Sequence, residues 1–499
     1  MKPKKEIKVS LLKNRYHYIF MKQLFLLKLL FLISFAQGEL KNQNKTESLE
    51  EISKSTASIE NQDFKKLKTD FRKGLYYFKK KNYKQALQYF QKSAEQGNPL
   101  AQSILGRMYS EGKGVPQNYK KAFDWYTKSA EQGNSSAQSI LGDRYYKGKG
   151  VTQDYKKAFD WYKKSAEQGD VSAQFMLGAM YYESKGVTQD YKKAFDWFEK
   201  SAEQGDVSAQ FNLGYMYYHG QDIPQNYKKA FDWYKKSAEQ GNALAQSNLG
   251  HMYYKGKGVP QDYKKAFDWY TKSAEQGNAL ALFNLGAMYY NGQGVSKDYK
   301  KSVYWYTKSA EQGNSSAQTD LGLIYYTGKG APQNYKKAFD WYKKSAEQGN
   351  SLAQMNLGSM YYKGKGVPQN YKKAVYWFEK SAEQGNALAQ VNLGAMYYNG
   401  QGTPQNYKKA FDWYKKSAEQ GNALAQVMLG DMYKEGQGVT QNFVYAYLWW
   451  NIVSKNGDKQ AIKSRDSLLK LMSSDQVAKA QKLYTQKAKE ITDNQLTSK

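Results

Sequence analysis

The pentapeptide Ser-Ala-Glu-Gln-Gly at residues 93–97 recurs along the chain with a constant period of 36 residues. Its ten copies begin at Ser93, Ser129, Ser165, Ser201, Ser237, Ser273, Ser309, Ser345, Ser381 and Ser417. A fixed period of roughly 20–50 residues is typical of stacked supersecondary units, each of which buries its apolar face only against its neighbours. The period therefore predicts an elongated array with a long binding surface, in place of one globular core.

Within one repeat the pattern predicts two helices. The first, helix A, is expected over about 99–110, with Asn98 as its N-cap, and its core stripe has helical spacing: Ala101, Ile104, Leu105, Met108 and Tyr109. Gly106 lies inside this helix, which indicates that a neighbouring helix packs closely against bare backbone. The second, helix B, is expected over about 119–132, capped by Asn118, with a buried side made of Ala122, Trp125, Tyr126 and Ala130.

The repeated motifs are Ala-Gln-x-x-Leu-Gly-x-x-Tyr, Gly-x-Gly-Val, Lys-Ala-x-x-Trp-Tyr and Ala-Glu-Gln-Gly. They resemble the Sel-1-like repeat, a helix-turn-helix relative of the tetratricopeptide repeat, and the resemblance covers about residues 64–457. It implies an all-α fold, an α-solenoid that forms a right-handed superhelix of about eleven 36-residue helix-turn-helix repeats. It also implies a scaffold of the bacterial envelope or a secreted one, of the kind used in assembly, signalling or host interaction.

The two ends of the chain depart from the repeat. Residues 1–38 read as a signal peptide, with Met21 as an alternative start, an apolar run over 24–35 and a cleavage site after Gly38. The alternative is an uncleaved anchor. Export would make the protein periplasmic or secreted, with no stable membrane span after cleavage. A flexible polar spacer is expected over 39–63.

The terminal repeats are also unusual. Residues 64–98 form a first repeat with a short, tetratricopeptide-like loop, and 99–457 contain the Sel-1-like repeats. Residues 458–499 are expected to form two capping helices, over 461–471 and 475–491, and a tail. Ser473 and Gln476 have the spacing of a capping box.

The formal net charge of +30 is distributed along the array, because the unit 227–262 carries six lysines against three acids. Two readings remain open: a solvated, solubilising face, or a surface that binds an anionic partner such as a polysaccharide through the columns of Lys120 and Lys121. Nucleic acid is the less expected partner. The chain has no cysteine, which excludes disulfides, thiolate zinc sites and cysteine nucleophiles.

If the repeats follow tetratricopeptide geometry, helix A lines a concave wall, and positions equivalent to 103, 107, 110 and 111 are exposed on it. This predicts a binding face for a protein or peptide partner. Its candidate residues are Phe175, Phe211, Tyr215, Phe283, Tyr146, Tyr182, Tyr218, Tyr254, Tyr290, Tyr326, Tyr362 and Tyr398. The alternative is that the tyrosines pack on a neighbouring helix and that the residues at the variable positions differ between repeats without a role in binding.

No catalytic, cofactor-binding or metal-binding residues are predicted. His219 and His251 lie in adjacent repeats without a carboxylate cluster in the sequence around them, and the recurrent serine has no histidine in most repeats. The loop 112–114 is glycine-rich but lacks the ending of a phosphate loop. The resemblance offers one enzymatic alternative, since some cysteine-rich exported relatives are described as binding or hydrolysing β-lactams, but their cysteines are absent here. We therefore expect a non-enzymatic scaffold.

Overall fold

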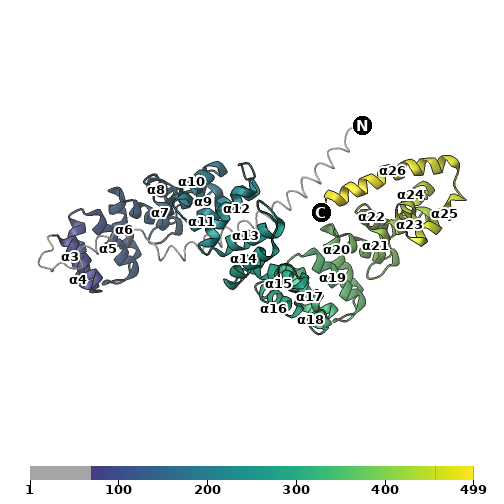
Figure 1. Ribbon diagram of the computed structural model, residues 1–499, viewed down its shortest axis with the longest axis horizontal. Coiled ribbons are helices and arrows are strands. Elements are labelled where there is room, and N and C mark those ends of the chain that lie inside the picture. The colour runs from purple at the N-terminus through teal and green to yellow at the C-terminus, as the bar shows by residue number, and fades with distance from the viewer. Residues whose placement is uncertain (1–68, 456, 498–499) are drawn as a thin grey trace. The chain divides into compact units, whose positions relative to one another are not determined.

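The computed structural model describes residues 69–455 and 457–497. Over these residues the chain forms 24 helices and no strand, and 22 of the helices make eleven successive pairs (Figure 1). The chain divides into two compact units, unit 1 (residues 1–273) and unit 2 (residues 274–499). The predicted all-α solenoid of eleven repeats is confirmed.

The first helix of each pair is helix A. From the second pair onward, successive helices A begin 36 residues apart. The helices A are α3 (Asp70–Lys79), α5 (Pro99–Glu111), α7 (Ser135–Lys147), α9 (Val171–Glu183), α11 (Val207–His219), α13 (Ala243–Lys255), α15 (Ala279–Asn291), α17 (Ser315–Thr327), α19 (Ser351–Lys363), α21 (Ala387–Asn399) and α23 (Ala423–Glu435).

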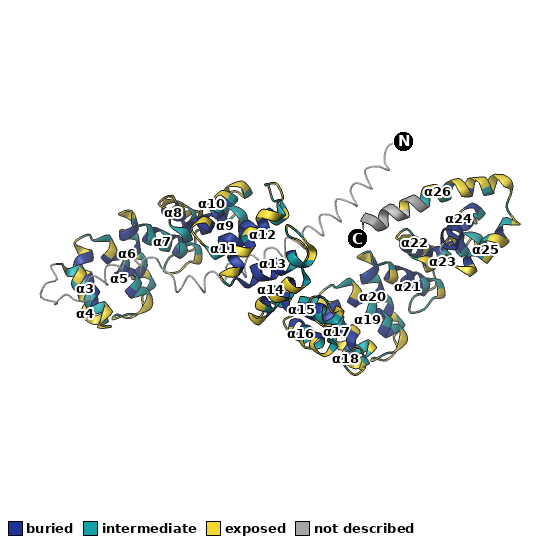
Figure 2. Ribbon diagram, in the orientation of Figure 1, coloured by how far each residue is buried: buried dark blue, intermediate teal, exposed yellow. Residues whose placement is uncertain are grey.

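The second helix of each pair is helix B. Over residues 70–255 and 279–435, each helix B packs against the helix A before it and against the helix A that follows. The helices B are α4 (Tyr83–Glu95), α6 (Tyr119–Glu131), α8 (Tyr155–Glu167), α10 (Tyr191–Glu203), α12 (Tyr227–Glu239), α14 (Tyr263–Glu275), α16 (Tyr299–Glu311), α18 (Tyr335–Glu347), α20 (Tyr371–Glu383), α22 (Tyr407–Ala418) and α24 (Phe443–Ser454). Buried residues lie between the two helices of a pair (Figure 2).

Local sequence signals set the helix ends. The Asn98 side chain accepts a hydrogen bond from the backbone N–H of Ala101 at 3.0 Å, and Asn118 accepts one from Lys121 at 2.9 Å. Both are N-caps, which satisfy N–H groups that have no partner inside the helix. Helix α5 ends at Gly112, whose φ of +70° is a conformation that glycine adopts without strain. The N-caps predicted at Asn98 and Asn118 are confirmed, and each of the two helices ends within one residue of its predicted C-terminus.

The glycine inside helix A lies against an aromatic ring of helix B. A Cβ atom placed on Gly142 would lie 2.6 Å from the ring of Tyr162, and one on Gly106 would lie 2.9 Å from the ring of Tyr126. Any larger residue would push the two helices apart, because such distances are well inside van der Waals contact. The close approach predicted from Gly106 is confirmed.

The pentapeptide joins helices within and between repeats. Ser129 is fully buried, and its hydroxyl donates to the carbonyl of Pro99 at 2.7 Å. The Gln132 amide donates to the side-chain oxygen of Gln102 at 2.7 Å, and the Gln102 amide in turn donates to the carbonyl of Ala94 in the preceding repeat at 3.1 Å. We call this chain of bonds the glutamine relay.

The loop between helices A and B is also shaped by packing. A Cβ atom on Gly150 would lie 2.3 Å from the carbonyl oxygen of Tyr119 at the start of the preceding helix B, and φ of Gly150 is +84°. Only glycine fits such a position without displacement. The glycines of this loop therefore serve the contact between repeats.

The terminal repeats match the predictions in their main features. Helices α3 and α4 are joined by the three residues 80–82, which confirms the short first loop. After α24, helices α25 (Lys459–Leu469) and α26 (Ser474–Thr497) follow, and α26 extends six residues beyond the predicted end. Ser473 and Gln476 exchange the two hydrogen bonds of the capping box.

The predicted signal peptide and spacer, residues 1–63, lie outside the described residues. Over the part of the chain that the structure does describe, none of the helices has the length and apolar composition needed to cross a membrane.

Candidate functional site: the helix-A face

The surface in question is formed by the second, fifth, ninth and thirteenth residues of each helix A, which we call the helix-A face. In α19 these are Leu352, Met355, Ser359 and Lys363. Spacings of three and four residues place them on one side of the helix. The buried residues that hold helix A in the core, such as Ala353, lie on the other side.

The phenylalanines at the fifth position are not available as we predicted. Phe175 and Phe211 are 6% and 2% exposed, and Phe283 is partly buried. Each ring packs against the aromatic residue of the following helix B, with centroid distances of 5.6–5.8 Å. The prediction that this column is exposed is wrong for Phe175 and Phe211, because the fifth residue points toward helix B of its own repeat.

The tyrosines at the twelfth position of helix A are all partly buried. Each packs against the first tyrosine of helix B in the same repeat, and the ring centroids lie 5.1–5.4 Å apart. Such tilted and edge-to-face pairs are favourable aromatic geometries. We call these residues the tyrosine ladder: Tyr146, Tyr182, Tyr218, Tyr254, Tyr290, Tyr326, Tyr362 and Tyr398.

A loop residue of the next repeat also contacts the tyrosine ladder. Gln221 accepts a hydrogen bond from the Tyr182 hydroxyl at 2.8 Å, and the Lys257 ammonium lies 5.0 Å from the ring centroid of Tyr218. Equivalent contacts are made by Lys185, Lys329, Lys365, Gln401 and Gln437. The tyrosine ladder thus links neighbouring repeats, which is the structural alternative raised by the sequence. Whether a partner also touches it is still a prediction.

Tyr215 occupies the ninth position of α11 and stacks on His219, with 4.2 Å between ring centroids. His251 lies on the far side of Tyr218, 6.4 Å from that ring. Desolvation and the charge of Lys257 lower the pKa of His219 to about 4, and desolvation with nearby lysines lowers that of His251. Both histidines are therefore neutral at pH 7. No group of three His, Asp or Glu residues that could hold a metal occurs among the described residues.

Unit 2 carries one exposed leucine on every helix A from α15 to α23. Four occupy the second position and one the ninth, which lie seven residues apart on the same side of a helix. We call this set the leucine row: Leu280 (48% exposed), Leu323 (44%), Leu352 (47%), Leu388 (52%) and Leu424 (60%). The described part of unit 1 has only Leu100 as an exposed leucine on its helix-A face, and serines occupy the second position of α7, α9 and α11.

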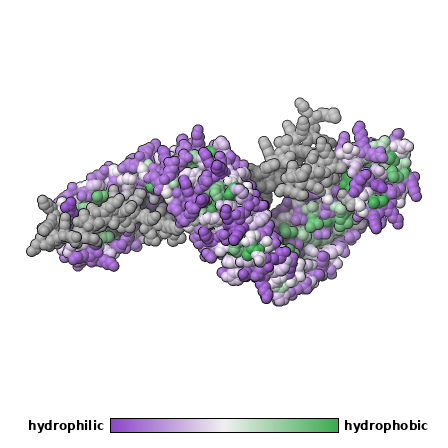
Figure 3. All heavy atoms as spheres, in the orientation of Figure 1, coloured by the Kyte–Doolittle hydropathy of each residue, from purple (hydrophilic) through white to green (hydrophobic). Residues whose placement is uncertain are grey.

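The leucine row lies on helices with little charge. Helices α15 and α21 contain no charged residue, and α17 contains only Asp320. Burial raises the pKa of Asp320 to about 6, although Tyr306 donates a hydrogen bond to it. Hydrophobic side chains of unit 2 gather in the region of α19 to α21 (Figure 3). The helix-A face is therefore apolar and low in charge from α15 to α21, whereas α23 carries Asp431 and Glu435 on it.

The two lysine columns of helix B differ in their contacts. Lys121 and its equivalents lie over the first tyrosine of the adjacent helix A, with ammonium-to-centroid distances of 5.0–5.6 Å. Lys120 and its eight equivalents are exposed, and they form no ion pair with described residues. Only the Lys120 column is thus free for an anionic partner, and that partner is still a prediction.

Sequence reasoning missed the leucine row. The signal was present, because the second residue of helix A is serine in some repeats and leucine in others. The leucine row could not be recognised from the sequence without knowing that this position is exposed, because a leucine at the start of a helix is equally compatible with burial.

The Sel1 repeat family matches the chain in eleven consecutive segments that run from residue 71 to residue 458. A protective antigen of uropathogenic Escherichia coli strains, which displays an SLR fold, is 38% identical, with a TM-score of 0.78 over 90% of this chain and 96% of that one. A Sel1 repeat protein from Oxalobacter formigenes is 36% identical, with a TM-score of 0.51 over 62% of this chain and 90% of that one. No curated protein matches the chain. The eleven matched repeats and these two structures place the chain in the Sel1 repeat family.

Proposed function

We propose that the protein is an exported, non-enzymatic scaffold that binds a protein partner along the helix-A face of unit 2. The observation that carries this proposal is the leucine row, five exposed leucines on five successive helices A. Sel1 repeats serve as scaffolds for protein–protein interaction, and the residues common to the repeats are occupied with contacts inside the array. Recognition of a partner therefore falls to the positions whose residues differ between repeats.

The energetics favour a partner with an apolar face. Burying a leucine side chain completely contributes about 1.5–3 kcal/mol. Each leucine of the row is about half exposed, so covering it contributes about 1 kcal/mol, and the five together about 5 kcal/mol. That is enough for a specific contact when rim hydrogen bonds add to it. The repeat spacing suits an amphipathic helix or an extended segment laid across successive helices A.

Site-specific photo-crosslinking tests the proposal in the producing cell. A photoreactive residue replaces Leu388 on the helix-A face or, as a matched control, the exposed Lys372 on helix B of the preceding repeat. We expect discrete adducts with a protein from position 388, and their loss when Leu352 and Leu424 are changed to serine, the residue found at this position in α7, α9 and α11. Adducts that arise only from position 372 would contradict the proposal.

Export rests on the sequence of residues 21–38 alone, with its basic start and its apolar run over 24–35. We propose a periplasmic or secreted location on this ground. Fractionation of the producing cells, followed by N-terminal sequencing of the recovered protein, tests it. The expected new N-terminus is Glu39, and recovery of the protein from the cytoplasm with residues 21–38 intact would contradict export.

A further inference from the structure

Arg144 stands at a position of helix A where the other repeats have a thioether or an aliphatic side chain. The equivalents are Met108, Met180, Met216, Met252, Met288, Ile324, Met360, Met396 and Met432. Arg144 is only 7% exposed. An arginine buried to this degree is expected to have a carboxylate partner, because an unpaired buried charge is costly.

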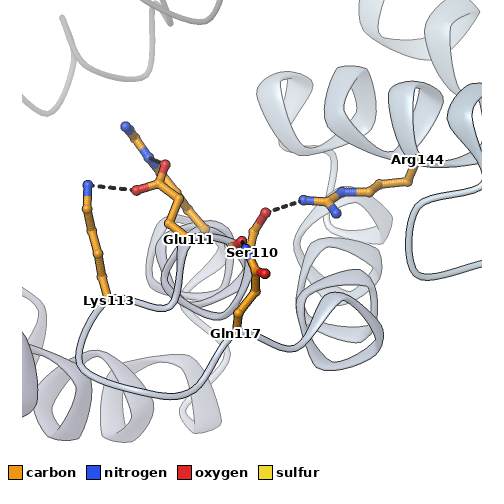
Figure 4. Close-up of polar contacts among 6 residues, drawn as sticks. Ser110, Glu111, Lys113, Gln117 and Arg144 are labelled. Carbon is orange, nitrogen blue, oxygen red and sulfur yellow. Dashed lines mark hydrogen bonds and ion pairs between the residues drawn. The ribbon is translucent and has the colours of Figure 1, made fainter.

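Arg144 has no such partner among the described residues. One guanidinium nitrogen, Nη2, donates to the hydroxyl of Ser110 at 2.6 Å (Figure 4). The guanidinium also lies 5.5 Å from the ring centroid of Tyr119 and 5.4 Å from that of Tyr126. The other nitrogen, Nη1, is buried and makes no hydrogen bond. A permanent cation is thus held by two rings and one neutral hydroxyl, with donor capacity left over.

The surroundings carry further positive charge. Glu111 is the nearest acid along α5, but Arg107 and Lys113 each contact it at 2.7 Å (Figure 4). Although desolvation opposes this, the hydrogen bonds from Lys113 and Arg107 hold the pKa of Glu111 below its usual value. Glu111 is therefore already paired with two cationic side chains, Arg107 and Lys113.

Ser110 is a second departure from the repeat at the same place. Seven of the eight repeats that follow α7, and α7 itself, have a tyrosine at this position, and α23 has Lys434. The tyrosine ladder thus has no tyrosine in α5, where Arg144 contacts Ser110 instead. The two substitutions occur together, in adjacent repeats, and they meet at a hydrogen bond.

We propose that Arg144, Ser110 and Arg107 form a site for an oxyanion, either a carboxylate of an acidic peptide or a phosphate. The planar guanidinium presents paired N–H donors that match two oxygens of one anionic group, and a partly desolvated site strengthens such hydrogen bonds. The anion binds at the guanidinium edge, takes up the donor capacity of Nη1 and neutralises the buried charge. This site lies in unit 1 and does not depend on the leucine row, so the two proposals succeed or fail separately.

Binding is measured on the full chain at low salt by fluorescence anisotropy. The probes are a fluorescein-labelled hexaglutamate peptide and its hexaglutamine counterpart, and inorganic phosphate serves as competitor. The key variant is Arg144→Met, because methionine occupies this position in eight other repeats and is compatible with the fold. Lys236→Met is the matched control, since it removes the same charge from an exposed position of unit 1 outside the Lys120 and Lys121 columns.

We expect Arg144→Met to weaken hexaglutamate binding at least tenfold, the loss typical of one charge-assisted contact, and Lys236→Met to change it less than twofold. The hexaglutamine peptide should not bind. Competition by phosphate would identify the free anion as a ligand, and its failure would identify the peptide carboxylate. Equal losses of affinity in the two variants would show that binding depends only on the overall charge, which would overturn the proposal. An unchanged affinity in Arg144→Met would also overturn it. The thermal midpoint of Arg144→Met, expected to be unchanged or higher, excludes misfolding as the cause.

Discussion

Ser201 illustrates the role of the recurrent residues. Its side chain is fully buried, and its hydroxyl donates to the backbone carbonyl of Val171 at 2.9 Å. The same bond, with lengths of 2.6–2.9 Å, occurs at the equivalent serines from Ser129 to Ser417. A hydroxyl in this position stabilises the end of a neighbouring helix and is inaccessible to a substrate.

Replacing Ser201 with alanine tests this assignment. The change removes one buried hydrogen bond and leaves a carbonyl without its donor, so we expect a loss of about 1–2 kcal/mol in stability. Thermal denaturation followed by circular dichroism measures it, with Ser172→Ala as the control, because Ser172 is a partly exposed serine at the second position of α9 in the same repeat. A Ser201→Ala variant as stable as the parent would contradict the structural role of the motif.

Asp320 gives the protein a pH dependence of known sign. Burial raises its pKa in the folded state to about 6, above the value of about 4 in an unfolded chain. The folded state therefore holds the proton more tightly, and this residue's contribution to stability falls as the pH rises from about 4 to 6, then stays low. Asparagine occupies the equivalent position in five other repeats, such as Asn356.

The variant Asp320→Asn should therefore be more stable than the parent at pH 7, by about 1–3 kcal/mol, and similar to it at pH 4. The difference between the two denaturation midpoints across this pH range isolates Asp320, because all other carboxylates titrate in both proteins. A difference that does not vary between pH 4 and pH 7 would contradict the prediction, because it would show that Asp320 has the same pKa in the folded and the unfolded protein.

The helices themselves could be predicted from the sequence, because their ends are marked by local signals. Asn98, Asn118 and Gly112 act within a few residues of their own position, and a pattern of four or five residues identifies them. The burial of Phe175 and the packing of the tyrosine ladder could not be predicted in this way. They depend on the rotation of one helix against another, to which residues distant in the sequence contribute, such as Phe198 for Phe175 and Gln221 for Tyr182.

The glutamine relay is the contact between elements that is most directly tested by mutation. In the relay of α19, Gln384 donates to Gln354 at 2.7 Å, and Gln354 donates to the carbonyl of Ala346 in the preceding repeat at 3.1 Å. Leucine stands at the equivalent position in α15, as Leu282, so the site accepts its volume.

We expect Gln354→Leu to lower stability by about 1–3 kcal/mol, because it removes the two hydrogen bonds that the Gln354 side chain makes with Gln384 and Ala346. Hydrogen exchange should report faster exchange in α18 and α19 than in α9 and α10, which keep their own relay. Uniform exchange across the array, or no change at all, would contradict the role of the relay in joining repeats.

At the scale of the whole molecule, the helix pairs described within each unit pack against their neighbours along the chain. The 36-residue period made a stacked array predictable, and the helical spacing of the apolar residues within each period made it an α-helical one. The identity of the recognition residues was not predictable in the same way. Leu388 and Arg144 became candidates only when their burial and contacts were known.

The central claim is that the molecule is a sum of interchangeable repeats held together by their recurrent residues. The most direct test is the denaturation of two internal deletions in unit 2. Deletion of residues 335–370 joins Asn334 to Tyr371 and removes one full period, so helix B is again capped by an asparagine and meets the preceding helix A. We predict a folded protein with a single repeat fewer and a modestly lower midpoint. Deletion of residues 335–352, half a period, should instead cause local unfolding and loss of helicity in the flanking repeats. Equal stability of the two deletions, or collapse of both, would contradict the account.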